Sequence, residues 1–230
     1  MNSLRSLSAF LLAIVFFSSC LKDSSSPPPA AAVLITNASP DAPGLDMYVD
    51  GALSLHNIPF GTDTGYAAIN PGTFTFDFTQ TGSTTSLLNH DVPFESNKFY
   101  SLFLVDSLSK IKLVVVEDAF NTVSADSAQV RYFDFSPDAP FHSLTITDGG
   151  DSVQYAVRGF NDQTSTTASF VSLKSGMYDI KLAQPGSSTP FKTFDNVILT
   201  GGKIYTFYLK GFYNGTGTQA FGLGKIQHFN

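Results

Sequence analysis

Alternating apolar and polar residues recur in short runs along this chain from about residue 32 onward. In residues 71–78 (PGTFTFDF) phenylalanine alternates with Thr and Asp, which would give a strand one apolar and one polar face. Clusters of Gly, Pro, Asn and Asp separate such runs, and no segment keeps a 3.6-residue period over the length of a helix. The pattern therefore predicts an all-β protein with few helices.

The runs form two copies of one pattern. The segment SPDAP at residues 39–43 recurs at residues 136–140, 97 positions later. An apolar run precedes it in both copies (AVLITN and QVRYFDF), and an alternating run follows it (LDMYV and SLTIT). Repetition of elements in the same order indicates an internal duplication. We expect SPDAP to be a structural corner, because its prolines end a strand and its Asp can hold a turn.

The later runs repeat as well, at a larger spacing. Residues 71–78 match residues 175–182, and residues 92–105 match residues 197–210 as strand, turn and strand. The offset there reaches 105, which predicts extra loop residues in the second copy at about 148–166.

Each copy contains about six or seven strand-like runs with turn signals between them, a pattern typical of an antiparallel β-sandwich or barrel. We expect a first domain at residues 33–121 and a second at residues 127–230, joined by a polar, loop-like stretch. Two domains of about 95 residues can each bury a sufficient core without disulfide bonds.

Residues 1–19 resemble a bacterial lipoprotein signal peptide. Their apolar run (LSAFLLAIVFF) is too short to span a bilayer stably, but it suits the apolar region of a signal peptide. Cys20 is the single cysteine, and it follows two serines, as in a lipobox. We predict that Cys20 is acylated, which makes a membrane its partner. Residues 20–32, rich in Ser and Pro, are expected to form a flexible tether.

The residues after Cys20 bear on the location of the protein. Residue 21 is Leu, where Asp is commonly associated with retention in the inner membrane. Lys22 and Asp23 resemble, with a single acid, a signal for export to the surface of some Gram-negative bacteria. We expect a location at the bacterial outer membrane, with the cell-surface orientation favoured over the periplasmic one.

The first copy resembles the bacterial extracytoplasmic family known as domain of unknown function 4397. SPDAP is followed in order by DMYVDG at residues 46–51, by PFG at residues 59–61 and by PGTF at residues 71–74. The second copy keeps SPDAP and the later strands but has LTITDG and RGF in place of the middle motifs. The resemblance implies export and tandem immunoglobulin-like β-sandwich domains. It implies no established activity.

Composition and charge exclude some functions. The net charge is −6, and the 13 basic residues are scattered, which argues against a nucleic-acid partner. Asp41, Asp46 and Asp50 lie close together, but a calcium site needs six or more oxygen ligands, and we expect the latter two on a solvated strand face. The four histidines lack the spacing of a zinc site. We therefore predict no metal and no cofactor.

Catalytic motifs are not evident. No G-x-S-x-G segment occurs, acylation would use the only cysteine, and Glu95 and Glu117 sit in no distinctive motif. The glycine-rich residues 211–224 lack the G-K-[ST] of a phosphate-binding loop and are expected to form a hairpin loop. We predict that the protein is not an enzyme.

Exposed aromatic side chains are the remaining candidates for binding. Tyr155, Phe160 and Tyr213 stand in loop-like surroundings and could contact a ligand, or they could cover the ends of the sandwiches or join the core. Ser127, in an Asp-Ser-Ala triplet between the domains, is a candidate for glycosylation. The leading hypothesis is a non-catalytic binding or adhesion module for glycan or protein. Alternatives are a structural subunit bound to another envelope protein and a hydrolase with an unrecognised pair of Asp residues.

Overall fold

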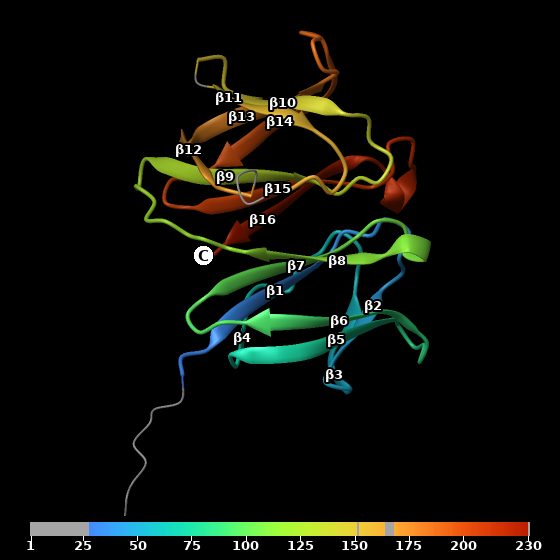
Figure 1. Cartoon of the computed structure of the whole chain (residues 1–230). Helices are drawn as coiled ribbons and strands as arrows, with labels where there is room; N and C mark the ends of the chain where they lie inside the picture. The colour runs from blue at the N-terminus through green and yellow to red at the C-terminus, as the bar shows by residue number, and fades with distance from the viewer. Residues whose placement is uncertain (1–27, 151, 164–167, 230) are drawn as a thin grey trace, which may run out of the picture.

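The computed structural model describes residues 28–150, 152–163 and 168–229, which fold into two β-sandwiches, one after the other along the chain and stacked face to face (Figure 1). The all-β prediction is confirmed, and neither domain is a barrel. In the described part of the chain the only helical segments are two short 3₁₀ turns, η1 (Leu108–Lys110) and η2 (Gly217–Gln219).

The first sandwich consists of a sheet in the order β4-β1-β7-β8 and a sheet in the order β3-β2-β5-β6. Strands β1 and β7 pair in parallel, and the other neighbours pair antiparallel. The bounds of its strands are β1 Ala31–Asn37, β2 Leu45–Val49, β3 Ala52–Ile58, β4 Ala67–Ile69, β5 Gly72–Gln80, β6 Ser86–Phe94, β7 Phe99–Val105 and β8 Lys112–Glu117.

The second sandwich repeats this topology, with sheets in the orders β12-β9-β15-β16 and β11-β10-β13-β14 and a parallel pair of β9 and β15. Each described sandwich has eight strands rather than six or seven, because the short edge strands β4 and β12 carry too few residues to show a period. The bounds are β9 Ser127–Asp134, β10 His142–Thr147, β11 Ser152–Arg158, β12 Val171–Lys174, β13 Gly176–Ala183, β14 Pro190–Leu199, β15 Ile204–Lys210 and β16 Gly222–His228.

Each sandwich has its own apolar core between its two sheets. The alternating phenylalanines of β5 point inward, and Phe76 and Phe78 are almost completely buried. Tyr178, Ile180 and Leu182 of β13 occupy the same place in the second core. The period-2 pattern of the sequence therefore identifies the inner face of these strands correctly.

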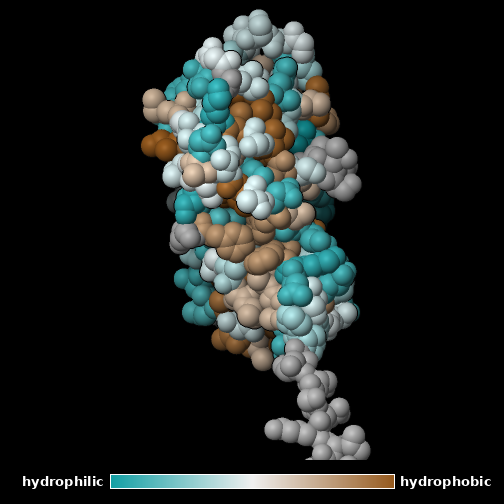
Figure 2. Space-filling model, turned by 90° about the vertical axis from the view of Figure 1, so that its left-hand side faces the viewer, coloured by the Kyte–Doolittle hydropathy of each residue, from teal (hydrophilic) through white to brown (hydrophobic). Residues whose placement is uncertain are grey.

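A third apolar cluster joins the two sandwiches. The sheet that contains β1, β7 and β8 packs on the sheet that contains β9, β15 and β16, so the molecule has four layers (Figure 1). Phe103 meets Phe133 edge to face and lies 4.8 Å, centroid to centroid, from Phe135. Figure 2 shows that apolar surface continues across the waist between the sandwiches. The central strands of these two sheets are therefore buried on both faces, and the two domains pack directly on each other.

The two SPDAP segments make the same corner. Ser39 donates from Oγ to the backbone oxygen of Asp106 at 2.7 Å, and Ser136 donates to that of Gly211 at 2.7 Å. The following Asp residues accept backbone N–H groups just beyond these points, Asp41 from Leu108 and Asp138 from Tyr213. The segment thus joins the end of the first strand to the turn after β7 or β15.

The strand register corrects one alignment between the copies. Leu45 pairs with Ile58 in the first sandwich, and His142 pairs with Arg158 in the second. Residues 159–161 (GFN), rather than 158–160, therefore correspond to PFG at residues 59–61. Gly61 and Asn161 both have positive φ, and each donates its N–H to the residue that ends the first strand.

The predicted signal peptide, Cys20 and most of the tether lie outside the described residues. Within the described ranges, no helix has the length and apolarity needed to cross a membrane.

Candidate functional site

A closed ring of hydrogen bonds crosses the interface between the sandwiches. Arg131 of β9 donates from Nη2 to Asp118 Oδ1 at 2.5 Å and from Nε to Thr206 Oγ1 at 2.7 Å. His228 of β16 lies 2.6 Å from Thr206 through Nε2 and 2.9 Å from the Tyr66 hydroxyl through Nδ1. The Tyr66 hydroxyl closes the ring by donating to Asp118 Oδ2 at 2.5 Å. The first sandwich, the linker between β8 and β9 (residues 118–126) and the second sandwich all contribute to it.

The charges in this ring are fully removed from water. The side chains of Arg131 and Asp118 are both 0% exposed. Asp118 also accepts a hydrogen bond from Ser101 Oγ at 2.7 Å, so three donors from both sandwiches satisfy its carboxylate. A buried ion pair of this kind tolerates desolvation only while its partners stay in place.

The directions of these hydrogen bonds are consistent with a neutral His228. Since the Tyr66 hydroxyl donates to Asp118, Nδ1 of His228 carries the proton that it donates to Tyr66, and in the neutral imidazole Nε2 then accepts from the Thr206 hydroxyl. Burial lowers the pKa of His228 to about 4, although the Asp118 carboxylate opposes this shift. Burial, followed by the charge of Asp118, raises the pKa of Tyr66, which keeps its hydroxyl protonated as a donor.

Aromatic rings surround these polar groups. The Arg131 guanidinium carbon lies 4.5 Å from the centroid of Phe170 and 4.9 Å from that of Phe133. Phe99 and Phe229 pack on Tyr66, and Phe120 packs on His228. These aromatic side chains exclude water, which strengthens the electrostatic contacts among the polar groups that they surround.

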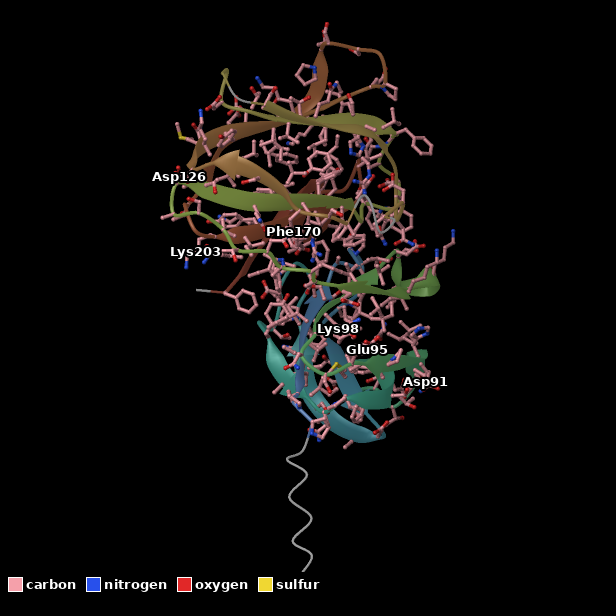
Figure 3. The ribbon with its side chains drawn as sticks, turned by 60° about the vertical axis from the view of Figure 1, so that its left-hand side comes forward. Asp91, Glu95, Lys98, Asp126, Phe170 and Lys203 are labelled. Carbon is pink, nitrogen blue, oxygen red and sulfur yellow. The ribbon has the colours of Figure 1, made fainter. Side chains whose placement is uncertain are left out.

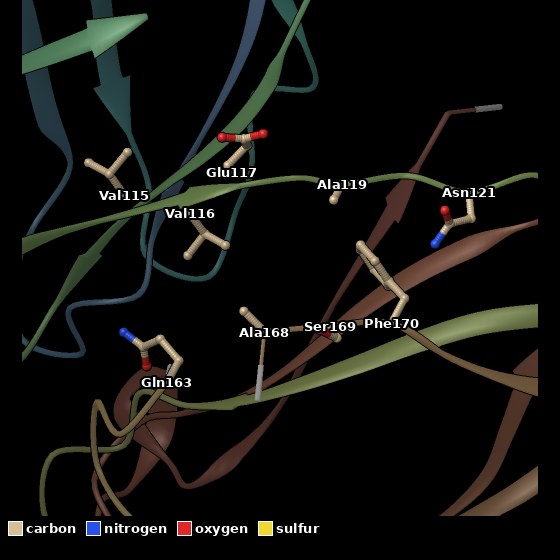
Figure 4. Close-up of a pocket in the computed structure, with 9 residues that line it drawn as sticks. All are labelled: Val115, Val116, Glu117, Ala119, Asn121, Gln163, Ala168, Ser169 and Phe170. Atoms are coloured by element: carbon tan, nitrogen blue, oxygen red, sulfur yellow. The ribbon is translucent and has the colours of Figure 1, made fainter. Parts of the chain in front are cut away.

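Beside the ring a cavity of about 470 Å³, the waist groove, opens between the sandwiches (Figure 4). Strand β8 and the linker form one wall, and the segment before β12 forms the other (Figure 4). Its lining residues are Val115, Val116, Glu117, Ala119, Asn121, Gln163, Ala168, Ser169 and Phe170. Ligand sites occur preferentially at such domain interfaces.

The waist groove combines an aromatic ring with polar side chains. Figure 3 shows Phe170 between the two sandwiches, where it covers Arg131. Glu117 at the rim accepts from Lys98 Nζ at 3.0 Å, and Lys98 also pairs with Glu95. The Oε1 atom of Gln163 is buried and has no hydrogen-bond partner among the described residues. An apolar floor with a few polar groups is typical of a site for a ligand that has both kinds of surface.

Of the three aromatic residues proposed from sequence, Tyr213 is placed at the surface. It is 37% exposed and lies edge-on between Phe191 and Phe221. A depression of about 380 Å³ there is also lined by Lys192 and Asn214. Asp138 of the second SPDAP fixes the backbone of Tyr213 at 2.6 Å, so this aromatic platform is a second candidate surface.

The other two aromatic residues have packing roles. Tyr155 lies on strand β11 rather than in a loop, packs on the second core and donates its hydroxyl to the Val130 oxygen at 3.3 Å. Phe160 packs against the apolar cluster between the sandwiches, with Lys112 Nζ at 5.7 Å from its ring centroid. Both side chains are only partly buried, and Tyr155 also lines a depression of about 770 Å³ beside residues 185–188. Ser127 is the first residue of β9, and its Oγ donates to the Ser124 oxygen at 3.4 Å.

The three aspartates that suggested a cation site lie in separate hydrogen-bond networks. The expectation of a solvated Asp46 is wrong, because Asp46 is 4% exposed and accepts from Asn57, Thr81 and Gly82. Asp50 accepts from the Thr75 N–H and Asp41 from that of Leu108. Among the described residues, no cluster of three His, Cys, Asp or Glu side chains could hold a metal.

Sequence reasoning missed a buried polar cluster in the second core. Tyr132 lies 2.6 Å from His142 Nε2, and Arg158 pairs with Asp162 and donates to the Tyr132 oxygen. Burial lowers the pKa of His142, and it raises the pKa of Asp134 to about 7. Leu45 and Ile58 hold the positions of His142 and Arg158 in the first copy, so the polar substitutions between the repeats were the available signal.

Comparison with known proteins supports the domain family for the first copy. Residues 31–141 match the family described as Domain of unknown function (DUF4397). The DUF4397 match covers the first sandwich, the linker, strand β9 of the second sandwich and the second SPDAP segment. No curated protein matches the chain. A solved structure described as "Alpha-glucan binding by a streptococcal virulence factor" covers 77% of this chain and 92% of its own, with 12% identity and a TM-score of 0.26.

Proposed function

We propose that this chain is a lipid-anchored, non-catalytic binding protein of the bacterial outer membrane, and that the waist groove is its ligand site. The observation that carries the proposal is the groove itself, which is lined by residues of both sandwiches and lies beside the buried hydrogen-bond ring that links them. A site fixed by a rigid polar network is preorganised, so little ordering is required when a ligand binds.

A glycan fits the chemistry of the waist groove best. The half-buried ring of Phe170 offers a surface for the C–H face of a sugar. Asn121, Gln163 and Glu117 place amide and carboxylate groups around it, which can bond sugar hydroxyls. An anchor at Cys20, followed by a tether, would hold such a site away from the membrane and available to external glycans.

Glycan-array binding with matched variants tests the groove. The fragment of residues 28–230 contains every described strand and core contact, so it is the protein to use. Val115 and Val157 are both exposed valines on strands, at 38% and 51%, but only Val115 lines the groove. We expect Val115→Asp to weaken binding at least tenfold and Asn121→Ala to weaken it about fivefold, the effect of one lost hydrogen bond. Val157→Asp should bind normally.

Two outcomes would contradict this assignment. If Tyr213→Ala abolishes binding while both groove variants bind normally, the aromatic platform is the site. If no glycan on a broad array binds, the ligand class is wrong, and crosslinking in cells to a single stable neighbour would favour an envelope subunit.

Proteinase treatment of intact cells tests the anchor separately. Because acylation of Cys20 would be the attachment, we expect the wild-type chain to fractionate with the outer membrane and to be degraded from outside. Cys20→Ala should instead appear in soluble fractions. Protection of the wild-type chain in intact cells would show the periplasmic orientation.

A further inference from the structure

The first sandwich contains an apolar cleft that is separate from the waist groove and from the aromatic platform at Tyr213. It has a volume of about 340 Å³ and lies between the two sheets, where edge strands β3 and β4 leave the core open. Its lining residues are Val33, Ile35, Met47, Val49, Ser54, Leu55, Thr64, Ala67, Ala68, Ile69, Phe74 and Phe76. The side chains at its base, such as those of Met47 and Phe76, are at most 4% exposed.

The two hydroxyl groups of the cleft are already engaged. Ser54 Oγ donates to the Ala52 oxygen at 3.2 Å, and Thr64 Oγ1 donates to the Gly65 oxygen at 2.9 Å. Thr64 Oγ1 also accepts the Ile35 N–H at 3.0 Å. The cleft therefore presents chiefly hydrocarbon to an occupant.

The second sandwich shows what fills this place. Leu55 pairs with Met47 across β2 and β3, and Tyr155 pairs with Leu144 at the equivalent register of β10 and β11. Tyr155 turns its ring into the second core, and burial raises the pKa of its hydroxyl. That hydroxyl bonds the oxygen of Val130, which pairs with Tyr205 as Val33 pairs with Tyr100. A phenol ring thus occupies in one copy the position where the other copy has a leucine and a cleft.

We propose that the cleft of the first sandwich binds a small phenolic ligand, with its ring placed as the Tyr155 ring is in the second sandwich. A volume of about 340 Å³ suits a small molecule and is too small for a protein segment of any length. Apolar cavities in protein cores bind free aromatic molecules because burial removes the ring from water. The site is independent of the waist groove, since the two share no lining residue.

Methyl NMR of methionine tests this proposal with 4-methylphenol, the analogue of a tyrosine side chain, as the probe. Met47 lines the cleft, whereas Met177 lies on β13 of the second sandwich and is 58% exposed. In the fragment of residues 28–230, titration should shift the Met47 methyl signal saturably and leave that of Met177 unchanged.

Two variants test whether the probe binds in the cleft. Leu55→Tyr recreates the residue of the second sandwich, so it should fill the cleft and weaken binding at least tenfold. Ala68→Phe, at an exposed position of the lining, should obstruct entry and weaken binding without the core change, in case Leu55→Tyr does not fold. Val115→Asp in the waist groove should bind 4-methylphenol as the wild type does, which separates this result from the glycan test.

The proposal is overturned if Met47 does not respond, or if both cleft variants bind the probe as the wild type does. The phenolic ligand class is wrong if decanoate, an aliphatic chain with a polar end, shifts the Met47 methyl signal at a lower concentration than 4-methylphenol does.

Discussion

Asp118→Asn is expected to lower the free energy of unfolding by about 3–5 kcal/mol, because it leaves the charge of Arg131 buried without its counter-ion. The Arg131 side chain is 0% exposed, and its Nη1 atom already has no hydrogen-bond partner among the described residues. Urea unfolding followed by circular dichroism measures the change. Since Asp118 joins Tyr66 and Ser101 to Arg131, we also expect the two sandwiches to unfold in one transition in the wild type.

Two control variants test whether the loss of stability in Asp118→Asn comes from the buried ion pair. Asp91→Asn removes an exposed carboxylate whose partner is Thr75, so it should change stability by less than about 0.5 kcal/mol. Adding Arg131→Met to Asp118→Asn removes the buried charge that has lost its counter-ion, so it should recover part of the lost free energy of unfolding. A loss below 1 kcal/mol for Asp118→Asn, or no recovery in the double variant, would contradict the assigned role of the ion pair.

Acid is expected to weaken the interface through His228. The folded-state pKa of His228, about 4, lies below its ordinary value of 6.5, so the unfolded chain takes up the proton first as the pH falls. The contribution of neutral His228 is complete above about pH 6.5, declines between pH 6.5 and 4, and is lost below about pH 4. A shift of this size corresponds to about 3 kcal/mol. Protonation would also turn Nε2 into a donor, so the Thr206 hydroxyl would lose the acceptor of its own proton.

The measurement compares stability against pH for the wild type and His228→Gln, which cannot titrate. The stability of the variant must be subtracted from that of the wild type at each pH, because other buried groups titrate in the same range. Burial lowers the pKa of His142 and raises the pKa of Asp134 to about 7. The wild type should lose about 3 kcal/mol more than the variant between pH 6.5 and 4. Parallel curves would show that His228 takes no part in the acid response.

The repeated fold was predictable because its signals are local. Alternation in residues 71–78 follows from one strand with one buried face, and SPDAP recurs because both copies need Ser and Asp at the same corner. The waist groove was not predictable, since its walls come from β8, the linker and the segment before β12. A signal for domain packing did exist: β7 (FYSLFLV) and β15 (IYTFYLK) are buried along almost their whole length, as strands covered on both faces are.

Local sequence patterns were enough to establish the all-β class, the duplication, the corner role of SPDAP and the inward face of the alternating strands, because each depends on neighbours close along the chain. Three features became visible only in the folded chain: Asp118 and Arg131 form a buried pair, Tyr155 fills one core while Leu55 leaves the other open, and Asp46 is enclosed. These outcomes depend on register and on sheet-to-sheet packing, which bring together residues that no local pattern relates.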